Sequence, residues 1–136
     1  MGFPTTSPLD HMLNNLPKRC PRVFILQEPQ ARDEATGKMK SLMNFSAALE
    51  WGEPVVCLPP GPVALSPYPT KEALKECLKD FTDDDYIICV GDPSLIFMAG
   101  MVACDLNRGR AKILKRDKEA RKYILVEINI HQRLGQ

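Results

Sequence analysis

The sequence lacks the cysteine and histidine patterns that bind metals. Its five cysteines are spread singly, without a C-x-x-C pair, and its two histidines, His11 and His131, lie near opposite ends of the chain. Structural metal sites need such ligands at short, paired spacings. We therefore expect no metal and no cofactor. Single cysteines of this kind are typical of a reducing, cytoplasmic compartment, where they pack as small hydrophobic residues.

Long hydrophobic runs and an excess of one charge are also missing. The longest apolar run, Leu95–Cys104, has about half the length of a membrane-spanning helix. The first residues show no basic segment followed by an apolar core, so we expect no secretory signal peptide. With 18 basic and 17 acidic residues the net charge is +1, which does not indicate a globally basic nucleic-acid binder.

The sequence has no recognisable catalytic motif. Around Gly37-Lys38, a phosphate-binding loop would need an earlier glycine where Arg32 stands and a Ser or Thr where Met39 stands. Ser94 lacks the flanking glycines of a nucleophile elbow. We name no catalytic residue, leave enzymatic activity open and favour its absence.

What the sequence does contain is a pattern of alternating strands and helices. The segment 85–130 is central: a buried strand at 86–90, then Gly91-Asp92-Pro93, where Asp92 suits a helix N-cap and Pro93 the first helical position. The helix at 94–104 is apolar nearly all round, so we expect it to be covered on most sides. A hairpin follows, with strands at 110–116 and 121–130 joined by Asp117–Ala120.

Earlier elements extend this pattern toward the N-terminus. We expect strands at 22–27 and 54–58, a polar loop at 30–40, a short helix at 45–51 capped by Asn44 with Phe45, Ala48 and Leu49 on its apolar side, and an amphipathic helix at 71–81 capped by Thr70. Asp83–Asp85 reads as a solvated acidic turn. Trp51 is expected to pack at the edge of the domain rather than to stack on a base.

These elements predict an α/β fold. We expect a single three-layer domain over residues 22–130, with a mixed, mainly parallel sheet of about five strands and a C-terminal β-hairpin. The strand at 86–90 should lie near the centre. Residues 1–21 are expected to form an N-terminal arm and residues 131–136 a C-terminal tail.

Basic residues are concentrated on the hairpin. Strand alternation places Arg110, Lys112 and Arg116 on one face and Lys115 on the other. Such a ribbon can bind nucleic acid or another acidic partner, with Tyr123 available for stacking, or the charges can protect an edge strand from unwanted pairing. The candidate binding residues are Arg110, Lys112, Lys115, Arg116, Lys118 and Arg121.

The carboxyl ends of the strands provide an alternative ligand site, because open α/β sheets bind ligands there. Its polar members would be Glu28, Arg32, Asp92 and Ser94, with Asp33 nearby. A helix N-terminus at this edge could receive an anion. Asp92, however, would place a negative charge where the anion should sit, so we favour a structural cap.

Three stretches resemble small uncharacterised proteins encoded by tailed bacteriophages. They are Phe24–Pro29, Asp85–Pro93 and Asn107–Asp117, and the similarity covers roughly residues 22–130. The resemblance implies an intracellular phase in a bacterial host and favours an interaction protein over a metabolic enzyme. It implies no particular activity.

Two hypotheses follow, with a third for assembly. The first is a non-enzymatic binding module that engages a protein or nucleic-acid partner through the basic hairpin and the N-terminal arm. The alternative is a small nucleotide- or anion-binding enzyme with its site at the strand ends. The chain could also be a homo-oligomer or a subunit of an assembly that pairs through an edge strand; no membrane partner is expected.

Overall fold

The computed structural model describes residues 20–61, 63 and 66–135, and its α/β architecture confirms the predicted fold class. Most of the N-terminal arm, including His11, lies outside the described residues. The elements are β1 (Arg22–Gln27), β2 (Gln30–Arg32), β3 (Met39–Ser41), the 3₁₀ helix η1 (Ser46–Glu50), β4 (Glu53–Leu58), α2 (Pro67–Cys77), β5 (Tyr86–Ile88), α3 (Pro93–Leu106), β6 (Arg110–Asp117) and β7 (Lys122–Asn129).

The main sheet has five strands in the order β4-β1-β5-β6-β7. Pairings of β1 with β4, of β1 with β5 and of β5 with β6 are parallel, and β6 and β7 form the antiparallel C-terminal hairpin. The strand that begins at Tyr86 is central, as predicted, although it ends at Ile88. β1 lies between two strands, which explains its nearly unbroken apolar run.

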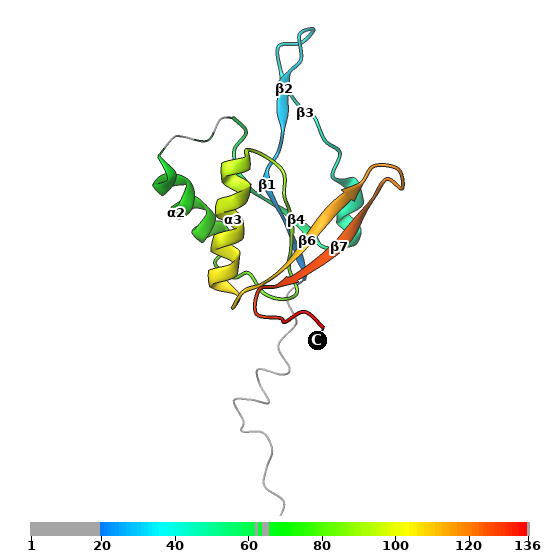
Figure 1. Ribbon diagram of the computed structural model, residues 1–136. Helices are drawn as coiled ribbons and strands as arrows, with labels where there is room; N and C mark the ends of the chain where they lie inside the picture. Colours follow the sequence, from blue (N-terminus) through cyan, green and yellow to red (C-terminus); the bar gives the residue numbers. More distant parts are fainter. Residues whose placement is uncertain (1–19, 62, 64–65, 136) are drawn as a thin grey trace, which may run out of the picture.

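The two faces of the sheet are covered unequally. On one face Phe24, Leu26 and Ile87 pack against α2 and α3; on the other face Val23 and Ile25 pack toward η1. Figure 1 shows the two long helices on one side of the sheet and the short η1 on the other. The three layers are therefore a helix pair, the sheet and a thin third layer formed by η1.

The polar segment 30–40 is not a plain loop. It forms a second, two-stranded sheet in which β2 pairs antiparallel with β3, from Gln30 opposite Ser41 to Arg32 opposite Met39. The backbone N–H of Asp33 donates to the carbonyl of Lys38 at 2.8 Å and closes the turn. Figure 1 shows this hairpin extending away from the rest of the molecule.

Two helix predictions need correction. α2 starts at Pro67, with Ser66 as N-cap, so Thr70 is a buried residue inside the helix and not its cap. Because proline at the first positions lacks an N–H that would need a partner, it starts the helix earlier than the apolar spacing indicated. The segment at 45–51 is 3₁₀ rather than α-helical, and Leu49 faces solvent while Ala48 is buried. Asn44 still accepts a hydrogen bond from Ser46 N–H at 2.8 Å.

Asp85 is not part of a solvated turn. Its side chain is fully buried and accepts hydrogen bonds from the backbone N–H groups of Arg22 (3.1 Å) and Thr82 (2.9 Å). The guanidinium of Arg22 lies 3.5 Å from the same carboxylate. The charge can be buried because it is paired and hydrogen-bonded, and it joins the start of β1 to the turn before β5.

Candidate protein-binding surface on α3 and the β6–β7 hairpin

The residues at the start of α3 cap the helix as predicted. Asp92 is the N-cap and its carboxylate accepts a hydrogen bond from Ser94 N–H at 2.8 Å, while Pro93 occupies the first helical position. One of the free amides at this helix end is thus satisfied by the protein itself. The Asp92 carboxylate acts here as a structural group.

The carboxyl ends of the central strands are held together by Gln27. Its side chain is only 7% exposed, and its amide nitrogen donates to the carbonyl oxygens of Pro59 (3.0 Å) and Gly61 (2.6 Å). Its amide oxygen accepts from the N–H of Asp92 at 3.3 Å. Gln27 therefore occupies the position between strand ends where an α/β protein would hold a ligand.

Only two of the four residues of the alternative ligand site lie together, because Asp92 and Ser94 adjoin at the start of α3. Glu28 borders a shallow hollow at the strand ends, together with Gln27 and Gly91. Ser94 lines the cleft between α2 and α3 instead. Arg32 is exposed on the projecting β2–β3 hairpin. The structure does not gather these side chains around one point.

The prediction that α3 is covered on most sides is wrong. Leu95, Ala99 and Ala103 are buried against the sheet, but Phe97 is 73% exposed and Met101 is 62% exposed. These two side chains, one helical turn apart, form an apolar ridge on the outside of α3. The all-round apolar pattern of α3 therefore includes a solvent-facing side.

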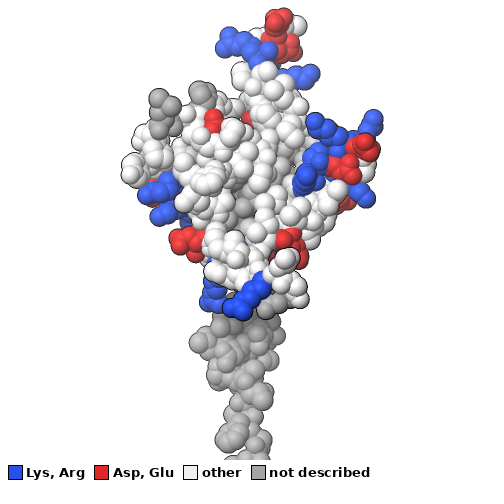
Figure 2. All heavy atoms as spheres, in the orientation of Figure 1, with Lys and Arg blue, Asp and Glu red and all other residues white. Residues whose placement is uncertain are grey.

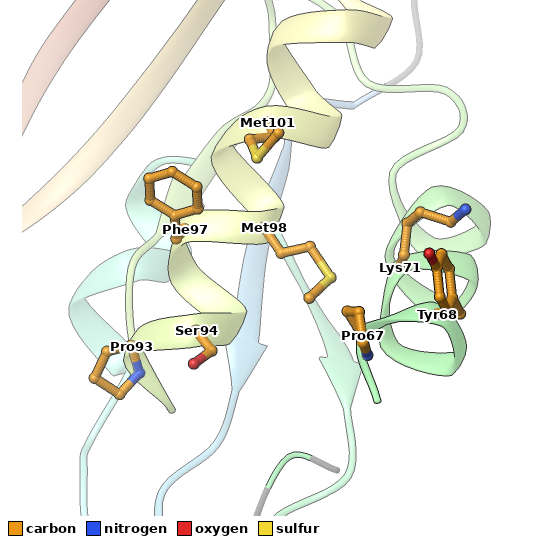
Figure 3. Close-up of a pocket in the computed structure, with 8 residues that line it drawn as sticks. All are labelled: Pro67, Tyr68, Lys71, Pro93, Ser94, Phe97, Met98 and Met101. Atoms are coloured by element: carbon orange, nitrogen blue, oxygen red, sulfur yellow. The ribbon is translucent and has the colours of Figure 1, made fainter. Parts of the chain in front are cut away.

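A hollow lies on each side of this ridge. Toward α2, a cleft of about 640 Å³ is lined by Tyr68, Met98 and Met101, among others. Figure 3 shows Met98 pointing from α3 toward α2, with Phe97 on the other side of the helix. Toward the hairpin, a groove of about 420 Å³ has an almost wholly apolar lining; we call it the α3–hairpin groove.

The hairpin contributes the second wall of the α3–hairpin groove. In the β6–β7 register, Ala111 is opposite Ile128, Ile113 is opposite Val126 and Lys115 is opposite Ile124. Residues directly opposite share a face, so this side of the hairpin changes from apolar at the base to basic toward the turn. The side chains of Ile124, Val126 and Ile128 are exposed. In Figure 2 the surface between α3 and the hairpin carries few charged atoms, whereas charges gather at the end of the hairpin.

The structure separates the six predicted basic residues into two groups. The first three have partners within the protein. Arg110 forms an ion pair with Asp83 at 3.1 Å. Lys112 lies 5.7 Å from the ring centre of Tyr86, and Arg116 lies 5.5 Å from that of Tyr123. The other three are exposed, as is their neighbour Lys122, and within the described residues none of them forms an ion pair. This exposed group is Lys115, Lys118, Arg121 and Lys122.

The turn of the hairpin leaves a net positive charge at this end. The carboxylate of Asp117 accepts hydrogen bonds from the N–H groups of Glu119 (3.1 Å) and Ala120 (3.2 Å). One of the two acidic side chains of the turn is thus used to shape it, and Arg121 adopts the left-handed conformation (φ 56°) that closes it. Within this turn, Glu119 is the one acidic side chain that is left to balance the charge of the exposed basic group.

The aromatic residues near the hairpin are packed inward. Tyr123 is 3% exposed, so the expectation that it stacks on a nucleic-acid base is wrong. Trp51 is partly buried and meets the ring of Tyr86 edge-on, with centroids 5.4 Å apart. It packs on the domain, as predicted. An exposed aromatic platform, which single-stranded nucleic acid would need, is therefore not provided by these residues.

The described part of the chain offers few other kinds of site. No helix in it has the length and apolar character that a membrane crossing demands. Nor do its His, Cys, Asp and Glu side chains gather in groups of three that could hold a metal ion. Sequence reasoning missed the apolar surface around α3. The signal was present in the apolar pattern of this helix, but the pattern predicted a buried core and not an exposed surface.

Comparison with known proteins supplies a family. No curated protein and no solved structure matches the chain. The family model described as "Phage Pam3 gp32-like protein" matches residues 21–130, which include every strand and helix given above. This match confirms the predicted resemblance to phage proteins, and it brings no activity with it. The chain belongs to the Phage Pam3 gp32-like protein family.

Proposed function

We propose that this protein is a non-enzymatic interaction module that binds an acidic polypeptide with apolar side chains. The partner's apolar side chains would enter the α3–hairpin groove, and its carboxylates would face the exposed basic group of Lys115, Lys118, Arg121 and Lys122. The observation that carries this proposal is the meeting of an apolar groove with unpaired cations on one face of the β6–β7 hairpin.

The apolar part of the surface favours a protein as partner. Phe97 and Met101 are exposed beside the groove, and Ile124, Val126 and Ile128 extend the apolar area along β7. A contiguous apolar patch with a polar rim is typical of protein–protein interfaces. A nucleic-acid interface would be more polar, and Tyr123 is buried beneath the opposite face of the hairpin.

The charged part of the surface sets the character of that partner. Lys115 lies opposite Ile124 on the groove side of the hairpin, so the basic group borders the apolar area directly. Complementary charge around an apolar centre mainly increases the association rate and the specificity. We therefore infer that acidic residues flank the partner's apolar anchors. Because the family is one of phage proteins, we place this interaction in the cytoplasm of an infected bacterium.

An enzyme with its site at the strand ends fits the geometry less well. Gln27 fills the space between those ends and Asp92 caps the helix that would hold an anion. A nucleotide or inorganic phosphate would have to compete with both. A thermal-shift screen against nucleotides and divalent metals would reveal such a ligand as a rise in melting temperature.

Binding can be measured with synthetic probes. We suggest fluorescence anisotropy with three labelled molecules: a peptide of glutamate and leucine, the same peptide with serine in place of leucine, and a short DNA duplex. The glutamate–leucine peptide should bind most tightly and should bind more weakly as salt is raised. Phe97→Ser combined with Met101→Ser should weaken binding by about tenfold, equivalent to about 1.4 kcal/mol.

Matched variants separate the groove from the rest of the surface. Leu49→Ser removes an exposed leucine on the other side of the sheet and should leave binding unchanged. Lys115→Glu should weaken binding, whereas Lys40→Glu on β3 should not. Tighter binding of DNA than of either peptide would overturn the proposal in favour of nucleic acid. Light scattering that shows a dimer disrupted by Phe97→Ser would assign the surface to a second copy of the chain.

A further inference from the structure

Two of the singly spaced cysteines meet in the folded protein. Cys57 lies in β4, and Cys77 is the last residue of α2. Their sulfur atoms are 2.6 Å apart, and both side chains are only partly buried. Each sulfur therefore reaches the other without rearrangement of the backbone, and both residues keep part of their surface exposed to solvent.

The surroundings make the two thiols unequal. The hydrogen bond with Cys57 lowers the pKa of the Cys77 thiol, and the positive charge of Arg22 acts in the same direction. The same contact, together with burial, raises the pKa of Cys57. Because the thiolate is the form that attacks a disulfide, Cys77 is the more reactive member of the pair.

We propose that Cys57 and Cys77 form a thiol–disulfide exchange site, which links β4 to α2 when the chain meets a low-molecular-weight disulfide such as oxidised glutathione. Cys77 attacks one sulfur of that disulfide, and a bond forms between them as the small disulfide breaks and releases one small thiol. Cys57 then attacks the sulfur of Cys77 and releases the second small thiol. The two protein thiols are oxidised, the small disulfide is reduced to two thiols, and these carry away the two protons.

The other cysteines of the described chain cannot take the second step. Cys20 and Cys89 are exposed and Cys104 is partly buried, and among the described residues none of the three contacts another thiol. An attack by any of them would stop at a mixed disulfide. The internal bond should therefore be selective for Cys57 and Cys77.

Peptide mapping tests the site directly. The full chain is incubated with oxidised glutathione, its remaining thiols are blocked with N-ethylmaleimide, and it is digested with trypsin without reduction. The expected main product joins peptides 41–71 and 76–79, at a mass two hydrogens below their sum. The oxidised protein should also melt several degrees higher than the reduced one, because the link constrains the unfolded chain, and dithiothreitol should reverse the shift.

Single variants distinguish an internal disulfide between Cys57 and Cys77 from the attachment of glutathione to one cysteine. Cys57→Ser should stop the reaction at glutathione attached to Cys77 and should abolish the melting shift, whereas Cys89→Ser should retain both the link and the shift. Recovery of Cys57 and Cys77 in alkylated form after oxidation would overturn the proposal. A predominance of links through Cys20, Cys89 or Cys104 would overturn it equally.

Discussion

The side-chain oxygen of Gln27 accepts a hydrogen bond from the backbone N–H of Asp92 at 3.3 Å, across the carboxyl ends of β1 and β5. The nitrogen of the same amide donates to Pro59 and Gly61, which follow β4. One buried side chain thus connects the ends of three neighbouring strands. The edge at which many α/β proteins place a ligand is here closed by the chain itself.

Replacing Gln27 tests this connection. Gln27→Leu keeps much of the volume but leaves two carbonyls and one N–H without their partner. We expect a loss of about 3 kcal/mol in the free energy of unfolding, since unsatisfied buried polar groups are costly. Urea denaturation provides the measurement, and Gln30→Leu in β2 should change the result by less than about 0.5 kcal/mol. Equal stability of Gln27→Leu and the parent would show that the amide does not hold the strand ends.

Gly91 is predicted to tolerate no side chain. Its φ is +123°, and a Cβ would lie 2.8 Å from the Cβ of Gln27. Gly91→Ala should combine backbone strain with this clash and cost about 3 kcal/mol. Gly37 in the β2–β3 turn also has a positive φ (+71°) but open space around it, so Gly37→Ala should cost only about 1 kcal/mol. Similar midpoints for the two variants in thermal or urea unfolding would contradict the close approach to Gln27.

The buried carboxylate of Asp85 gives a third prediction. Asp85→Ala removes the acceptor of the Arg22 and Thr82 N–H groups and the partner of the Arg22 guanidinium. Breaking a buried pair in this way should cost about 3–5 kcal/mol. Asp84→Ala changes the neighbouring, exposed carboxylate and should have an effect below about 0.5 kcal/mol. Chemical denaturation of both variants gives the two free energies of unfolding. Their difference shows how much of the loss comes from the burial of the Asp85 carboxylate and how much from the removal of a negative charge.

The two sides of α3 should respond differently to truncation. Leu95 is fully buried against the sheet, so Leu95→Ala should lower the free energy of unfolding by about 2–5 kcal/mol. Phe97→Ser, on the exposed ridge, should change it by less than about 0.5 kcal/mol. Calorimetry on the two variants gives both values. A large loss of stability for Phe97→Ser would mean that this side of the helix is packed and would remove the ridge from the proposed interface.

Local signals were sufficient to predict much of the fold. β1, β5 and β7 carry apolar, β-branched runs, and Asp92-Pro93 is a capping pair whose effect depends only on its neighbours in sequence. The β2–β3 hairpin escaped prediction because its strands are short and polar and have no apolar alternation. Asp85 could not be distinguished from Asp83 and Asp84 by composition, since the partner that buries it, Arg22, is distant in sequence.

The candidate site was predicted less completely than the fold. The basic residues of the hairpin were found, but only the structure shows that Arg110 is paired with Asp83 while Lys115 is exposed beside apolar side chains. The apolar helix was found too, yet an all-round apolar pattern has two explanations, a buried core or an exposed binding face. The contact between Cys57 and Cys77 depends on how α2 packs on β4, which no spacing in the sequence expresses.

The position of β1 in the sheet also determines when the protein can fold during synthesis. Val23 pairs with Pro54 on one side and with Tyr86 on the other. The ribosome therefore releases β1, the strand with the most buried residues, long before its second neighbour has been translated. Until then its backbone has an open edge, which is the condition under which nascent chains aggregate or recruit chaperones. By contrast, β6 and β7 emerge as a local hairpin that can close as soon as its turn is made.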